Sequence, residues 1–169
     1  ALEQFDSAAN EYVMMASLQQ RAFDYEGHRR TTKKLESLAK RTANPRIKAL
    51  AALCLGEVAD KQGNYREAVS HLEFAAEYFN KAVQQNPDLT QIETENESCE
   101  YYKGMLGIIY SSLGRIYEHQ NLPSEALRFH QMGLDCALEV NDFANIGSAY
   151  HAIGNSHSML GQSEKAVTA

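Results

Sequence analysis

The chain has 169 residues, of which 44% are hydrophobic, 16 are basic and 22 are acidic. This length and apolar content suffice to bury a core, which excludes a disordered chain. The formal net charge of −6 argues against a protein whose whole surface binds nucleic acid. We find no run of about 18 apolar residues and no charged-then-apolar leader, so we expect neither membrane insertion nor export.

The cysteines and the helix-forming residues narrow the class of protein further. Cys54, Cys99 and Cys136 lie far apart and include no Cys-x-x-Cys pair, as is usual in a reducing compartment, so we expect a cytoplasmic protein. Ala, Leu, Glu, Gln, Lys and Met dominate and only three prolines occur, which predicts helix almost throughout. The chain begins without Met and stops at Ala169, so we also expect a fragment of a longer protein.

A period of forty residues runs along the chain. The segment 113–117, Leu-Gly-Arg-Ile-Tyr, recurs at 153–157 as Ile-Gly-Asn-Ser-His, and Ala126 recurs as Ala166. Residues 55–57, Leu-Gly-Glu, followed by 63–68, have the same layout. A weaker first copy precedes them: Tyr25 lies forty residues before Tyr65, although His28 stands where Ala68 predicts a small residue. Self-similarity at a fixed period is the signature of a repeat protein.

Each unit predicts two helices separated by a short break, near Gly63, Asn121 or Gly161. We place the units of this single array at about 9–48, 49–88 and 107–146, with a truncated unit at 147–169. Three prolines mark helix ends: Pro45 should begin a helix, Pro87 should close one and Pro123 should lie near a start.

The interval between the second and third units is longer by about eighteen residues than the period predicts. This insertion, about 85–105, should form a loop and an extended lead-in to the next helix. It is acidic, with Asp88, Glu93, Glu95, Glu97 and Glu100.

Small residues recur where two helices of a unit should meet. A Gly inside a helix costs about 1 kcal/mol relative to Ala, so the helical glycines need a packing reason. We expect close approach of the paired helices to supply it, with larger apolar side chains filling the seam. The glycines are Gly56, Gly114 and Gly154, the facing alanines are Ala68, Ala126 and Ala166, and the filling side chains are Leu55, Leu113 and Ile153.

These Leu-Gly-x-x-Tyr positions with a downstream Ala resemble the tetratricopeptide repeat (TPR) family, with repeats longer than the usual length of about thirty-four residues. The junction 137–142, Ala-Leu-Glu-Val-Asn-Asp, resembles the Leu-Gly-Asn-repeat spindle-orientation adaptors. The resemblance covers roughly 9–169 and implies an all-α, right-handed α-solenoid of antiparallel helix pairs, a TPR-like superhelix whose concave face holds partner segments. The Asn that follows Gly in that family is present only at Asn155, with Glu57 and Arg115 at the equivalent sites, so no particular partner carries over.

In such a solenoid the first helix of each pair lines the concave face. Asn155 could donate to and accept from a peptide backbone, and Arg115 could bind a carboxylate. Plain solvation of these side chains is the alternative. A chaperone-tail clamp is not expected. Its cation and amide positions fall here on Leu53, Ser111 and His151 and on Glu57, Arg115 and Asn155, which do not form a two-carboxylate clamp. The expected partner-binding residues are Leu53, Glu57, Asp60, Lys61, Ser111, Arg115, Glu118, His119, Ser148, His151, Asn155 and Ser158.

A basic stretch crowds the first unit. It could bind nucleic acid or an acidic lipid surface, although no Phe, Tyr or Trp is interleaved for base stacking among its basic residues from Arg29 onward. A solvated helix face is the alternative that we favour. Its members are Arg21, Arg29, Arg30, Lys33, Lys34, Lys40, Arg41, Arg46 and Lys48.

No motif for catalysis is present. The six histidines form no His-Glu-x-x-His pattern, and Gly-rich phosphate loops, Ser-centred elbows and paired cysteines are missing from the sequence. Cys54 and Cys136 fall on apolar stripes and should act as small hydrophobic residues. We expect no catalytic activity, cofactor or metal.

The sequence therefore predicts a scaffold or adaptor that binds a protein or peptide segment, with a cytoskeletal setting by resemblance alone. Two alternatives stay open. One is a sensor domain whose superhelical pitch changes when a peptide or metabolite binds. The other is self-association through the C-terminal end, around Ile153 and Leu160.

Overall fold

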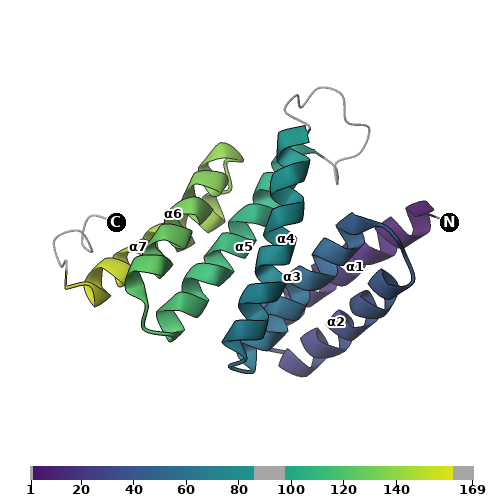
Figure 1. Cartoon of the computed structure of the whole chain (residues 1–169), viewed down its shortest axis with the longest axis horizontal. Helices are drawn as coiled ribbons and strands as arrows, with labels where there is room; N and C mark the ends of the chain where they lie inside the picture. The colour runs from purple at the N-terminus through teal and green to yellow at the C-terminus, as the bar shows by residue number, and fades with distance from the viewer. Residues whose placement is uncertain (1, 86–97, 162–169) are drawn as a thin grey trace. The chain divides into compact units, whose positions relative to one another are not determined.

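The computed structural model describes residues 2–85 and 98–161, and within these ranges the only regular secondary structure is helix (Figure 1). This confirms the all-helical class that the sequence predicts. The helices are α1 (Leu2–Arg21), α2 (Tyr25–Lys40), α3 (Pro45–Lys61), α4 (Tyr65–Gln85), α5 (Cys99–His119), α6 (Pro123–Glu139) and α7 (Phe143–Met159).

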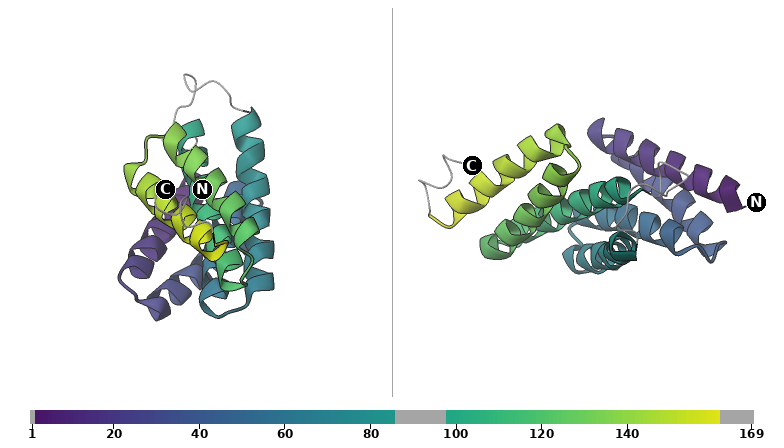
Figure 2. Two further views of the ribbon diagram at one scale, coloured as in Figure 1. Left: turned by 90° about the vertical axis from the view of Figure 1, so that its left-hand side faces the viewer. Right: turned by 90° about the horizontal axis from the view of Figure 1, so that it is seen from above.

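The chain divides into two compact units, residues 1–78 and 79–169, with the division inside α4. In the first unit α1 packs against α2 and α2 against α3, and α1 also contacts α3. In the second unit α5 packs against α6 and α6 against α7, and α5 also contacts α7. Figure 2 shows each of these two sets of helices from two further directions. In both units, a first helix touches its own partner and the first helix of the next pair, which is the contact pattern of stacked helix pairs.

Local caps set where the helices begin. Pro45 stands in the first turn of α3, where the side chain of Asn44 accepts a hydrogen bond from the backbone N–H of Arg46 at 2.9 Å. The side chain of Ser98 caps α5 by accepting from the backbone N–H of Tyr101 at 3.0 Å. Because of this cap, residues 99–105 are helical, and our expectation of an extended lead-in there was wrong. Residues 86–97 of the expected insertion, Pro87 among them, lie outside the described residues.

The turns inside the helix pairs keep the sequence period. The second residue after each first helix has a positive φ: 58° at Phe23, 75° at Gly63, 58° at Asn121 and 69° at Gly161. Gly63 follows Phe23 by 40 residues, and Gly161 follows Asn121 by 40. Gly and Asn adopt this left-handed conformation readily, whereas Phe does so at a cost. The expected breaks are therefore confirmed, and the first copy differs by placing Phe in the strained position.

A close approach between paired helices repeats in the same register. A Cβ atom at Gly56 on α3 would lie 2.7 Å from Leu72 Cγ and 3.2 Å from the backbone oxygen of Ala68 on α4. At Gly114 on α5, a Cβ atom would overlap the imidazole ring of His130 on α6. Leu72 and His130 both follow their glycine by 16 residues. The packing reason that we predicted for these two helical glycines is thus confirmed.

The side chains expected to fill the seams behave differently. Leu113 is 1% exposed and Ile153 is 6% exposed, as predicted. Leu55 is only partly buried and lines a surface depression with Phe74 and Ala52, so its assignment to the seam was wrong. On α3 the large aliphatic side chains that are fully buried are instead Ile47 and Leu50.

The strain at Phe23 can be tested by substitution. We expect Phe23→Gly to raise the free energy of unfolding by about 1 kcal/mol, because the 76% exposed ring contributes little packing and Gly accepts a positive φ. Urea denaturation measures the change. The control Phe23→Ala keeps a Cβ atom and should give no gain, so an equal gain from both variants would contradict the account.

The glycine seam makes a second prediction. We expect Gly56→Ala to lower the free energy of unfolding by about 1–2 kcal/mol, because the new methyl group must displace the fully buried Leu72. Gly104→Ala on α5 is the matched control: no atom lies within 4 Å of its Cβ position, so better helix propensity should stabilise by about 0.5–1 kcal/mol. Urea denaturation measures the stability of both variants. A gain in stability for both would refute the close approach at Gly56.

Candidate functional site

Eight of the expected partner-binding residues lie on two neighbouring helices of the second unit, α5 and α7. On α5 three of them are half-buried and one, His119, is exposed. On α7 all four are exposed and follow one another at intervals of three or four residues, which places them on one helix face. Because α5 contacts α7, we call this set the α5–α7 surface. Its members are Ser111, Arg115, Glu118 and His119 on α5, and Ser148, His151, Asn155 and Ser158 on α7.

Glu118, one member of this surface, also takes part in a polar junction of α5, α6 and α7. Glu118 Oε1 on α5 accepts a hydrogen bond from Ser156 Oγ on α7 at 3.3 Å. The same oxygen lies 3.3 Å from Nε2 of His130 on α6. Ser156 is fully buried and His130 is 3% exposed, so both partners of Glu118 are held by packing. Neither Ser156 nor His130 was among the residues predicted to take part in a site. The sequence contains one signal for His130: it follows Gly114 by 16 residues, as Leu72 follows Gly56.

The exposed polar groups of α7 leave hydrogen-bonding capacity for a partner. Asn155 Nδ2 lies 3.3 Å from His151 Nε2, so the amide and the imidazole are oriented together. Ser148 Oγ donates to the backbone oxygen of Ala144 at 3.0 Å. The carbonyl oxygen of Asn155 can still accept a hydrogen bond, and Ser148 Oγ can accept one as well. Tyr150 is 40% exposed on the same helix, but its spacing places it on a different face from these residues.

The first unit offers far less of the expected surface. Leu53, Glu57 and Asp60 are 3%, 8% and 6% exposed, and only Lys61 is exposed. Glu57 Oε2 lies 3.5 Å from Nε2 of His28, the residue that replaces the expected small side chain. The helix that carries these residues, α3, contacts both α1 and α2. The three buried residues therefore do not belong to an open surface, contrary to our expectation.

Arg46 does not belong to the basic surface of the first unit either. It is 3% exposed, its Nη1 donates to Asp6 Oδ1 at 3.1 Å, and its Nη2 donates to Asn10 Oδ1 at 2.6 Å. These bonds fasten α3 to α1, so Arg46 has a structural role. The remaining members of the basic stretch are exposed.

Two thiols, those of Cys54 and Cys136, do not suit nucleophilic chemistry. Burial, with a contribution from Glu57, raises the pKa of Cys54 well above its usual value. Burial and the nearby carboxylates of Glu139 and Asp135 raise the pKa of Cys136 to about 11. Both are protonated at neutral pH, and a thiol in that form is a poor nucleophile. Within residues 2–85 and 98–161, no three metal-ligating side chains cluster, and no helix is long and apolar enough to cross a bilayer.

The apolar seam expected to mediate self-association is partly closed. Ile153 is 6% exposed and packs with Leu134 and Ala149 in the core of the second unit. The large apolar side chains that α7 does expose include Phe143 and Tyr150. Ile153 is therefore a core residue.

Comparisons with known proteins add little to this description. No family model matches the chain. No curated protein matches it. Among solved structures, the crystal structure of MamA protein is similar over 96% of this chain and 88% of that chain, with 16% identity and a TM-score of 0.33. A score this low carries no argument, so the tetratricopeptide resemblance rests on the residues and helix pairs described above.

The polar junction predicts a pH-dependent stability. Burial lowers the pKa of His130 below its ordinary value of 6.5, although Glu118 raises it in part and Arg115 lowers it further. Because the unfolded chain then binds the proton more readily, the stabilisation is present above about pH 6.5 and is lost as the pH falls through the folded pKa. We expect the free energy of unfolding to fall less between pH 7.5 and pH 5 in His130→Leu than in the wild type.

His130→Leu is the informative variant because Leu72 occupies the equivalent position against Gly56. The control is His151→Gln, which removes an exposed imidazole and should leave the wild-type pH profile unchanged. Urea denaturation at a series of pH values measures all three proteins. Equal slopes for the wild type and His130→Leu would contradict a neutral, buried His130.

Proposed function

We propose that this chain is a non-catalytic protein-binding module whose α5–α7 surface holds a segment of a partner protein. One observation carries the proposal: exposed hydrogen-bonding side chains line one face of α7 beside α5, and the Glu118–Ser156 hydrogen bond joins the two helices behind them. A surface built on packed helices is pre-ordered, so it binds without the cost of ordering loops.

The chemistry of this surface favours an extended segment. A bound extended chain presents backbone N–H and C=O groups, which need partners once water is excluded. Ser148, His151 and Asn155 supply donors and acceptors along one face of α7. The guanidinium group of the half-buried Arg115 suits a carboxylate on the partner. The resemblance to spindle-orientation adaptors adds a cytoskeletal setting to the proposal.

Paired substitutions on α7 and α6 test the proposal. We expect His151→Ala with Asn155→Ala to reduce partner recovery at least tenfold, because it removes two hydrogen-bonding groups from the centre of the α7 face. The measurement is affinity capture from lysate with quantitative mass spectrometry, after circular dichroism has established equal helix content.

The control is Gln131→Ala with Asp135→Ala on α6, an exposed pair with the same four-residue spacing and a 3.0 Å hydrogen bond. It should leave recovery unchanged. Partners lost equally from both double variants would indicate damage to the fold. Partners retained by the α7 variant would place binding elsewhere on the chain.

A further inference from the structure

A groove in the first unit is independent of the α5–α7 surface. It follows the seam between α2 and α3 and contains two hollows. One, of about 420 Å³, has an apolar floor that includes Ala39, Ala52 and Leu55, with Phe74 of α4 at its side. The other, of about 500 Å³, is lined by residues that include Tyr25, Arg29, Val58 and Lys61. We call the whole feature the α2–α3 groove.

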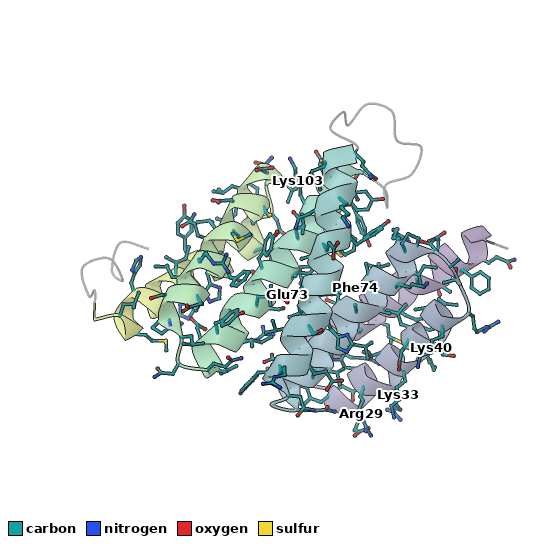
Figure 3. The ribbon with its side chains drawn as sticks, viewed as in Figure 1. Arg29, Lys33, Lys40, Glu73, Phe74 and Lys103 are labelled. Carbon is teal, nitrogen blue, oxygen red and sulfur yellow. The ribbon has the colours of Figure 1, made fainter. Side chains whose placement is uncertain are left out.

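Helical spacing makes the two hollows parts of one feature. On α2, Arg29 lines the second hollow and Lys40 lines the first, eleven residues further along the helix. Lys33 lies between them on the same face, and Figure 3 shows these three side chains along α2. Eleven residues of helix span about 16 Å, which matches about five residues of extended peptide. On α3, Leu55 and Val58 lie three residues apart and continue the apolar floor from one hollow to the other.

The rim of the groove is positively charged. Four cations, Arg29, Lys40, Lys48 and Lys61, line the two hollows together with two carboxylates, Glu26 and Glu36. Counting Lys33, which lies between the hollows on α2, the surplus is three positive charges. The two carboxylates pair with cations on their own helix: Glu26 with Arg29 at 3.1 Å and Glu36 with Lys40 at 2.6 Å. Within the described part of the chain, Lys33 and Lys48 make no ion pair. The rim therefore has unneutralised positive charge along its length.

The groove also exposes apolar area. Phe74 is 51% exposed and Leu55 is partly exposed, so a phenyl ring and a branched side chain meet water beside a floor of alanines. Covering them with a partner's apolar side chains is favourable by roughly 25 cal/mol for each Å² removed from water. A complementary ligand must then offer both carboxylates and apolar side chains.

We propose that the α2–α3 groove is a second docking surface that binds an acidic peptide segment. Its carboxylates would pair with the lysines of the rim, and an apolar side chain between them would pack on Leu55 and Phe74. A flat bilayer cannot reach the recessed alanine floor, and the hollow around Phe74 offers no stack of aromatic rings for successive bases. The combination of charge and apolar depth therefore favours a peptide over a membrane or a nucleic acid.

Peptide selection on the whole 169-residue chain tests this proposal. A random eight-residue display library is selected on the wild type and counter-selected on Lys40→Gln with Lys48→Gln. We expect enriched peptides to combine Glu or Asp with large apolar residues. The binding of fluorescein-labelled synthetic copies of these peptides is measured by fluorescence anisotropy. Their affinity for the Lys40→Gln/Lys48→Gln variant and for Phe74→Ala should be at least tenfold lower than for the wild type. Their affinity for the wild type should fall as the salt concentration is raised.

Matched variants separate the groove from general charge. Arg30→Gln with Lys34→Gln removes the same two charges from exposed positions of α2, and should change affinity less than twofold. Phe143→Ala removes an exposed phenyl ring from α7 and should have no effect. Equal losses in Arg30→Gln/Lys34→Gln, or enriched peptides without acidic residues, would overturn the proposal. The proposal would also be overturned if the selection enriched no peptide while a twelve-nucleotide RNA or phosphatidylserine vesicles bound the chain through Lys40 and Lys48. None of these outcomes depends on the α5–α7 surface.

Discussion

The close approach of paired helices at a glycine is the constraint on which the rest of the structure depends. At Gly56 the α3 backbone lies so near Leu72 and Ala68 that a methyl group has no room, and Gly114 meets His130 in the same register. A glycine inside a helix weakens that helix, so this contact replaces local stability with tertiary packing. It sets which face of each helix turns inward, and hence which side chains are left for water or for partners.

The same register explains which parts of the fold the sequence predicts. The forty-residue period places the turns at Gly63, Asn121 and Gly161, where Gly or Asn accepts a positive φ, and the structure has those turns. The period is weaker in the first copy, because Phe23 and His28 replace residues that the other copies keep small or flexible. Even so, the backbone of Phe23 adopts the conformation of the equivalent turns, which means that packing overrides local preference there.

The candidate surface is less predictable than the fold. Spacing along one helix identifies a face, but it does not say which neighbouring helices cover that face. On α3 the expected groove residues Glu57 and Asp60 are buried in a helix that packs against both α1 and α2. On α7 the corresponding positions, Asn155 and Ser158, are exposed. Equivalent positions of a repeat can therefore be structural in one unit and available to a partner in another, and only the three-dimensional contacts distinguish the two cases.

Photo-crosslinking tests the central claim, that the α5–α7 surface binds a partner protein, most directly. A photoreactive amino acid replaces His151 on that surface or, as the control, Gln131 on α6; both positions are exposed. The account predicts discrete protein adducts from position 151, competed by excess unlabelled chain, and none of these adducts from position 131. Identical adducts from both positions, or adducts from position 131 alone, would contradict it.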